Sequence, residues 1–180
     1  MAAGDGLVSM TPTSIAHSGT SASINADGGV DFTAVTSLSL NGVFTSEIDN
    51  YLIVCDSDAS TDLGLRSRLR VSGSDASGSN YTRQYLYADG TSRVGLRDST
   101  TFGQFSYVSA ANWSGFHLHM YGPALAQPTA YRSVTVAGYL GGYIEDSAIT
   151  HSLSTAYDGI TIYTSTGNIT GNVHVFGYEE

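Results

Sequence analysis

Apolar and polar residues alternate in short runs along the chain. The clearest run, residues 63–71, places leucines and a valine on one side and arginines on the other. A period of two is typical of a β-strand that buries one face. The run 115–121 alternates in the same way, and we expect Phe116, Leu118 and Met120 to point inward there. These patterns predict strands, and no stretch shows the period of a long amphipathic helix.

Residues that favour turns separate the runs at intervals of about 8–12 residues, the spacing of sandwiches and barrels. Asp89-Gly90 predicts a hairpin with a type I′ turn, because this pair tolerates positive φ angles. From the candidate segments we expect about nine or ten strands. The candidate segments are residues 7–15, 30–35, 37–44, 52–55, 63–71, 81–87, 92–97, 104–108, 115–121, 130–140, 159–164 and 173–178.

The predicted fold is therefore all-β: an antiparallel β-sandwich of jelly-roll type, which protects strand edges from pairing with other chains. We expect a single domain over residues 1–180, with a short N-terminal arm at about residues 1–6. The length of 180 residues suits one domain with a sizeable core. A hydrophobic content of 41% with 12 tyrosines is too apolar for a disordered chain, although Gly and Ser are frequent.

The charge balance excludes several kinds of partner. The net charge is −9, and all seven basic residues are arginine. Nucleic-acid backbones and anionic lipids are bound mainly through basic residues, so we expect neither as a partner. The opening residues lack the pattern of a signal peptide, and no apolar run is long enough for a membrane span. We expect a chain made in the cytoplasm that is not inserted into a membrane.

Two polar groups could bind a metal ion. His117 and His119 lie two residues apart on a predicted strand, so both project to one face, as a metal site requires. Nearby carboxylate ligands are missing, and two exposed or interface histidines are the preferred interpretation. Asp56, Asp58 and Asp62 resemble the start of a calcium loop, but the turn glycine and the later glutamate are absent. An ordinary polar loop is preferred here, and the question of Ca²⁺ stays open.

No catalytic constellation is complete. Cys55 is alone in an apolar run, which favours a small buried thiol. Glycoside hydrolysis needs two facing carboxylates, and nearly all of the acidic residues fall in predicted turns or at the C-terminus. Phosphate loops, nucleophile elbows and paired Cys-x-x-Cys motifs do not occur. We therefore predict a protein without enzymatic activity, catalytic residues, metal or cofactor.

Two stripes of Arg and Tyr are the remaining candidates for binding. Tyr and Arg are enriched where a surface becomes an interface. We expect the stripes to lie on neighbouring strands of one sheet and to form a subunit or partner interface, with ordinary cross-strand packing as the alternative. The first stripe is Arg66, Arg68 and Arg70, and the second is Tyr81, Arg83, Tyr85 and Tyr87.

Several segments resemble a family of small virion proteins of tailed phages, of the marine and cyanobacterial type. They are residues 6–8 (Gly-Leu-Val), 11–15 (Thr-Pro-Thr-Ser-Ile), 35–44, and 49–51 (Asp-Asn-Tyr). The most characteristic is the closing segment 165–178, which is similar to the terminal hairpin of fibre, tail-knob and minor structural proteins. The resemblance implies a β-rich, homotrimeric module exposed on the virion, with no catalytic motif.

This resemblance leads us to expect a structural protein of the phage tail or tail fibre, contributing to host adhesion or virion assembly. Its partners would be copies of itself, other tail or capsid proteins, and a host surface glycan. Two alternatives stay open. One is a capsid decoration (cement) protein that stabilises the head lattice, and the other is a carbohydrate-binding or carbohydrate-active protein.

Overall fold

The computed structural model describes residues 6–110, 112–137 and 142–178, and these residues form β-strands and connections without a helix. The predicted all-β fold is confirmed, but the described residues contain 14 strands, more than expected. The predicted arm lies almost wholly outside the described residues. The strands are β1 (Leu7–Ser9), β2 (Ser14–Ile24), β3 (Val30–Asn41), β4 (Asn50–Ala59), β5 (Leu63–Val71), β6 (Ser74–Asp75), β7 (Tyr81–Asp89), β8 (Ser92–Thr100), β9 (Gly103–Val108), β10 (Ser114–Tyr121), β11 (Thr129–Ala137), β12 (Tyr143–His151), β13 (Gly159–Thr164) and β14 (Ile169–Tyr178).

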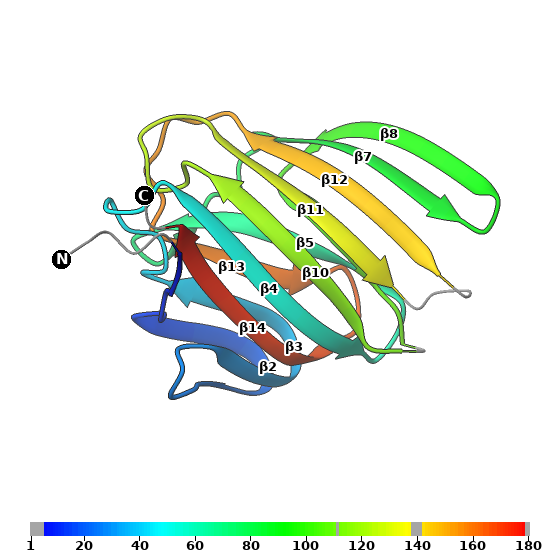
Figure 1. Cartoon of the computed structure of the whole chain (residues 1–180), viewed down its shortest axis with the longest axis horizontal. Coiled ribbons are helices and arrows are strands. Elements are labelled where there is room, and N and C mark those ends of the chain that lie inside the picture. Colours follow the sequence, from blue (N-terminus) through cyan, green and yellow to red (C-terminus); the bar gives the residue numbers. More distant parts are fainter. Residues whose placement is uncertain (1–5, 111, 138–141, 179–180) are drawn as a thin grey trace.

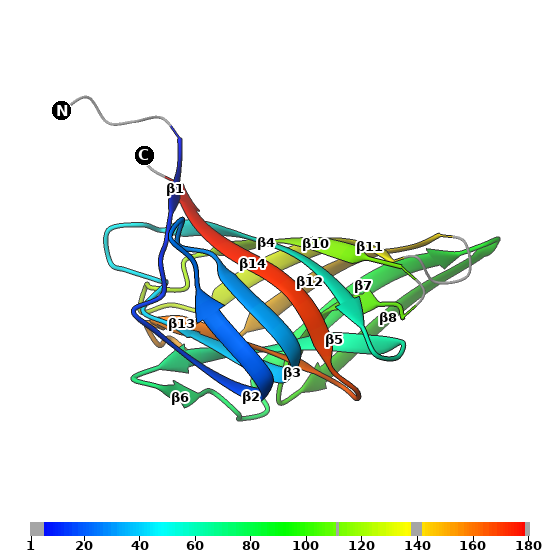
Figure 2. The same ribbon diagram turned by 90° about the horizontal axis from the view of Figure 1, so that it is seen from below.

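The strands form one continuous antiparallel sheet that curls into a sandwich of jelly-roll type. Its path is β6-β5-β13-β3-β14-β4-β10-β11-β12-β7-β8, and β1, β2 and β9 pair with β14, β3 and β5 respectively. One layer contains β4, β10, β11, β12, β7 and β8, and the other contains β9, β5, β13 and β3 (Figure 1). Figure 2 shows the two layers on edge, with β14 between them at the curl.

Contacts across the interior hold the two layers together. The rings of Phe105 on β9 and Phe116 on β10 meet at 4.8 Å between centroids. The hydroxyl groups of Ser67 on β5 and Tyr131 on β11 are 3.1 Å apart. As predicted, Phe116, Leu118 and Met120 point inward. The core therefore lies between β5, β13 and β3 on one side and β4, β10 and β14 on the other.

A β-bulge explains one difference from the predicted strands. Segments 30–35 and 37–44 were expected to be separate strands, whereas β3 runs without a break from Val30 to Asn41. Ala34 has a φ of 47°, and Gly19 on β2, which pairs with Val35, has a φ of 129°. A Cβ atom at Gly19 would lie 2.2 Å from the Ala34 carbonyl oxygen, so only glycine fits. The extra residue bends the strand and does not end it.

The β7–β8 hairpin forms where Asp89-Gly90 predicts it, with Asp89 opposite Ser92. Of the two central residues only Gly90 has a positive φ, 56°, which is the pattern of a type II′ turn and not the expected type I′. β8 is the last strand on the sheet path, and its side chains are mostly exposed. The hairpin extends β7 beyond the core, and this extension forms one end of the candidate site.

Candidate functional site

A groove lined by tyrosines lies on the inner face of the β12–β7 pair. Tyr85 and Tyr87 of β7 point inward, beside Glu145 of β12, which pairs with Tyr87 in the sheet. The facing strand β9 contributes Gln104 and Tyr107. The enclosed volume is about 280 Å³. Its lining consists of Tyr85, Tyr87, Asp89, Gln104, Tyr107, Tyr143 and Glu145.

The tyrosine rings form a connected aromatic ladder. Tyr85 and Tyr87 stack with centroids 6.1 Å apart, and Tyr87 stacks on Tyr143 at 5.4 Å. Tyr107 from β9 tilts against Tyr143 at 5.5 Å, which connects the two layers. The guanidinium of Arg83 lies 3.8 Å from the centre of the Tyr85 ring and caps the ladder. Tyrosine has few rotatable bonds, so these packed rings form a rigid surface.

Glu145 places a carboxylate within this aromatic surface. The residue is only 2% exposed. It accepts a hydrogen bond of 2.7 Å from the Tyr143 hydroxyl and one of 2.6 Å from the Ser147 hydroxyl. Burial and the bond to Glu145 raise the pKa of Tyr143, because both favour the neutral phenol. Among the described residues, no cation lies within ion-pair distance of Glu145.

Arg83 lies beside the groove, over the ring of Tyr85. It lies beyond Tyr85 on β7 and is 6% exposed. Its Nη2 atom pairs with Asp98 of β8 at 3.0 Å. The Nε and Nη1 atoms are buried without a hydrogen-bond partner among the described residues. The charge of Arg83 is thus balanced by Asp98, and its position is fixed by the ring of Tyr85.

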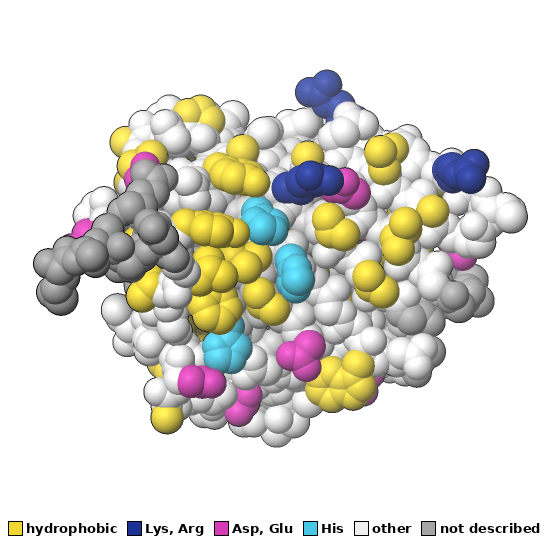
Figure 3. Space-filling view, viewed as in Figure 1, with side chains coloured by type: hydrophobic (Ala, Val, Ile, Leu, Met, Phe, Trp, Pro, Cys, Tyr) yellow, Lys and Arg dark blue, Asp and Glu magenta, His cyan; other side chains and the backbone are white. Residues whose placement is uncertain are grey.

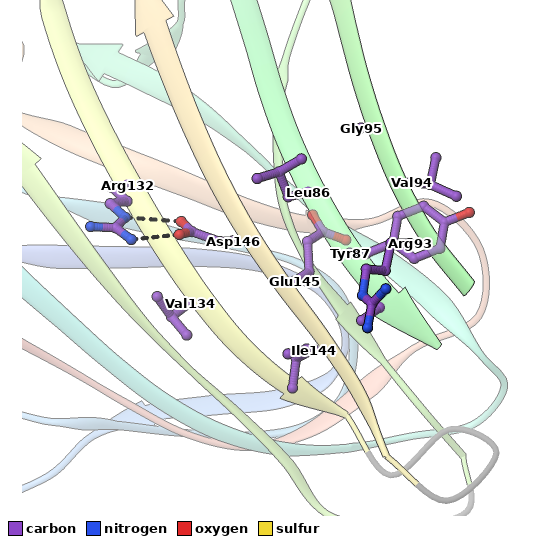
Figure 4. Close-up of a pocket in the computed structure, with 11 residues that line it drawn as sticks. Leu86, Tyr87, Arg93, Val94, Gly95, Arg132, Val134, Ile144, Glu145 and Asp146 are labelled. Carbon is purple, nitrogen blue, oxygen red and sulfur yellow. Dashed lines mark hydrogen bonds and ion pairs between the residues drawn. The ribbon is translucent and has the colours of Figure 1, made fainter. Parts of the chain in front are cut away.

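The outer face of the same strands carries an apolar trough of about 570 Å³. Leu86, Val134 and Ile144 are 62%, 51% and 57% exposed. Figure 4 shows these side chains near the ion pair between Arg132 and Asp146. Arg132 Nε donates to an Asp146 carboxylate oxygen over 2.9 Å, and this bond lowers the pKa of Asp146. The trough is therefore lined largely by apolar side chains, and its charged lining residues are the Arg132–Asp146 pair, Arg93 and Glu145.

His117 and His119 point outward from β10, as predicted. Figure 3 shows histidines beside hydrophobic side chains on the outer face of this layer. His119 Nδ1 lies 3.2 Å from the Tyr178 hydroxyl. Among the described residues, no group of three or more His, Cys, Asp or Glu side chains could hold a metal ion. The two histidines share a face but lack further ligands.

The two Arg and Tyr stripes do not lie on neighbouring strands, so this prediction is wrong. β5 pairs with β13, β9 and β6, whereas β7 pairs with β12 and β8. The stripe of β5 lies on the outer face of one layer, and the stripe of β7 lies on the inner face of the other. Tyr81, Arg83 and Arg70 are 0%, 6% and 8% exposed, and none of them lines the tyrosine groove.

The arginines of β5 bind groups within the chain. Arg66 lies over the ring of Phe102 at 4.2 Å, and Arg68 over that of Tyr163 at 5.3 Å. Arg68 Nε also donates to the carbonyl of Thr101 over 3.1 Å. These contacts fasten the β8–β9 connection to the outer face of β5.

Arg70 is held within the same layer. It forms an ion pair with Asp75. It also donates from Nε to Asn41 Oδ1 over 2.9 Å and from Nη1 to Thr161 Oγ1 over 2.8 Å. These bonds tie the short strand β6 and its turn to β5.

The predicted polar loop at Asp56 and Asp58 is part of a strand. β4 continues to Ala59, and both carboxylates project from its exposed side. Asp62 accepts hydrogen bonds of 3.0 Å from the Ser109 hydroxyl and the Ala110 amide. The three residues therefore do not share one loop. Cys55 is buried, as expected, and burial raises the pKa of its thiol.

Sequence reasoning missed the strand that completes the groove. No strand was predicted between residues 141 and 159, yet β12 spans Tyr143–His151. Its inward side chains include Glu145, Ser147 and His151, and this polar content hides the usual apolar period. The signal that could have revealed it is length, because a structureless loop of this size is uncommon in a small domain.

No protein-family model matches the chain, and no curated protein matches its sequence. Among solved structures, one similar chain is the catalytic domain of an endo-1,3-beta-glucanase (laminarinase) from Thermotoga petrophila RKU-1. The identity is 8% over 92% of this chain and 77% of that chain, with a TM-score of 0.24. A likeness of this size carries no argument about activity. The described ranges contain no helix long and apolar enough to cross a membrane.

Proposed function

We propose that this protein is a non-enzymatic, carbohydrate-binding β-sandwich that serves as an exposed adhesion module of a phage tail or tail fibre. The observation that carries the glycan-binding part is the tyrosine ladder around Glu145. Sugar rings offer apolar C–H faces that pack on aromatic rings, and hydroxyl groups that bond to carboxylate and amide oxygens. The groove supplies both kinds of group in a pre-formed hollow, as small-molecule sites do.

Binding is favoured over hydrolysis by the placement of the carboxylates. A glycosidase holds its two carboxyl groups on opposite sides of the scissile bond, roughly 5–10 Å apart. In this groove Glu145 and Asp89 lie on paired strands of a single wall. The facing strand contributes Gln104 and Tyr107, which offer an amide and a phenol. The groove can therefore hold a sugar, but no described residue places a carboxylate on its far side.

The position on the virion rests on the resemblance of residues 165–178 and the other quoted segments to phage virion proteins. A homotrimer would present three grooves, and avidity would strengthen weak binding to a repetitive host glycan. Quantitative mass spectrometry of purified particles tests the location. A few to tens of copies per particle fit the tail, whereas hundreds of copies would identify a capsid decoration protein.

A glycan array tests binding directly, with Tyr87→Ala and Leu86→Ala as a matched pair. These neighbours lie on opposite faces of β7, so both remove a large side chain but only Tyr87 lines the tyrosine groove. We expect Tyr87→Ala to abolish glycan signals and Leu86→Ala to keep them, with thermal melting confirming that both fold. No signal with the wild-type chain would contradict glycan binding. Release of reducing sugar from a bound polysaccharide would replace a binding role with hydrolysis.

A further inference from the structure

The charges that line the tyrosine groove are all of one sign. Of its seven lining residues in the described part of the chain, Asp89 and Glu145 are acidic and none is basic. The nearby Arg83 does not offset them, because Asp98 already pairs with it. The whole chain carries a net charge of −9, which adds a repulsive field for any approaching anion.

Glu145 also keeps unused capacity to accept hydrogen bonds. An ionised carboxylate has about four acceptor positions, and the described contacts of Glu145 are the hydroxyls of Tyr143 and Ser147, one on each oxygen. A buried carboxylate with free acceptor positions and no cation is stabilised by a ligand that brings positive charge. Asp89 lies on the same wall, diagonally across the β7–β12 pair, and is only partly buried.

We infer that the groove selects glycans by charge: it binds amino-sugar chains that carry ammonium groups, binds neutral chains less tightly, and excludes uronic-acid or sulfated chains. This inference rests on the proposed glycan binding. An ammonium group donates charge-assisted hydrogen bonds to Glu145 and Asp89, while the sugar ring packs on the tyrosines. The anionic groups of an acidic polysaccharide would meet two carboxylates and no cation.

Titration calorimetry with three tetrasaccharides of matched length tests the inference. They are glucosamine, N-acetylglucosamine and galacturonic acid oligomers, compared at mildly acidic pH and low salt. We expect the wild-type chain to bind the glucosamine oligomer at least about tenfold more tightly than the N-acetylated one, as one charge-assisted bond provides. No binding of the galacturonic acid oligomer is expected. Added salt should reduce the preference.

Three variants test whether the preference for the amino-sugar oligomer comes from the groove. Glu145→Gln and Asp89→Asn each remove one groove charge, and each should lower the amino-sugar preference by about three- to tenfold. Asp146→Asn changes the net charge equally on the outer face of the same strand, and it should leave the preference unchanged. Asp89→Asn is at a partly exposed position and keeps the test valid if Glu145→Gln fails to fold.

The failures can be told apart. Equal binding of all three oligomers, lost in Tyr87→Ala, would overturn charge selection and leave glycan binding intact. A preference for the galacturonic acid oligomer, or for an anionic glycan on the array, would likewise overturn charge selection and leave glycan binding intact. No binding to these oligomers or to any array glycan would contradict the proposed function and this inference with it.

Discussion

In β10 the side chains that point into the sandwich are apolar, whereas those of β12 and β7 are largely polar. Leu118 is fully buried, and its exposed neighbour on the same strand is His117. In β12 the pattern is reversed, since Glu145 is buried and Ile144 is 57% exposed. Both strands belong to one layer, so the difference does not come from the fold. It shows that β10 contributes to the core along its length, whereas β12 and β7 contribute to the core at one end and line the tyrosine groove at the other.

The largest expected effect is a difference in the free energy of unfolding between a variant in β10 and a variant in β12. Leu118→Ala should lower the free energy of unfolding by about 2–5 kcal/mol, because it leaves a cavity in the core. Ile144→Ala should change it by less than about 0.5 kcal/mol, because that side chain is mostly solvated. Urea denaturation of the two variants measures the contrast. Equal losses would show that the outer apolar side chains are as important for folding as the core.

The second effect concerns the polar interior. Glu145→Ala should lower the free energy of unfolding by about 1–3 kcal/mol. The reason is that the hydroxyls of Tyr143 and Ser147 lose the carboxylate that accepts their hydrogen bonds. The double variant with Tyr143→Phe should cost less than the sum of the single changes, since it removes one stranded donor. A double-mutant cycle by denaturation measures this coupling. Additive losses would mean that the two residues act independently.

The third effect is a pH dependence of the free energy of unfolding, which comes from the buried His151 at the end of β12. Burial lowers the pKa of His151 below its usual value of 6.5, and its Nδ1 lies 3.2 Å from the Tyr157 hydroxyl. As pH falls below about 6.5 the unfolded chain takes up the proton first, so stability is lost until the pH reaches the folded pKa. For a single titrating group, the free energy of unfolding should change by no more than about 1.4 kcal/mol per pH unit.

Unfolding measured between about pH 8 and about pH 5 tests this dependence. His151→Phe should flatten the curve, whereas His117→Ala on the exposed face should not. Asp31 and Asp146, whose pKa values are lowered, affect stability in a more acidic pH range. Their contributions to the free energy of unfolding are lost only as the pH falls below the usual value of 3.8. A wild-type curve that is flat from pH 7 to pH 5 would contradict the prediction for His151.

The smallest effect belongs to the outer ion pair. Arg132 and Asp146 have side chains that are 58% and 43% exposed, and such pairs contribute about 0–1 kcal/mol. Arg132→Ala should therefore lower the melting temperature only slightly, and added salt should reduce the difference. Thermal melting at low and high salt measures it. A larger or salt-independent loss would indicate that the Arg132 side chain acts by packing.

The sequence allowed the fold class and several strands to be predicted, because period-two alternation is local. It located β10 with its inward Phe116 and Leu118, and the β7–β8 hairpin from Asp89-Gly90. Alternation failed for β12, where Glu145 and Ser147 face inward. It could not show which strands pair, since β5 and β7 lie far apart on the sheet path although both carry arginine. Of the seven described groove residues only Tyr85 and Tyr87 were therefore named as binding residues from sequence, and their function as an interface was inferred from the wrong neighbours.

β8 ends the sheet path, and this position has a consequence for the behaviour of the protein at high concentration. Among the described strands it pairs only with β7, so its other side offers backbone donors and acceptors to any extended chain. Arg93, Arg97 and Asp98 lie along this strand with Gly95 at its centre. Charged residues and glycine make a strand edge a poor template for β-aggregation. The hairpin that lengthens the groove thus also carries the residues that keep neighbouring molecules from joining edge to edge.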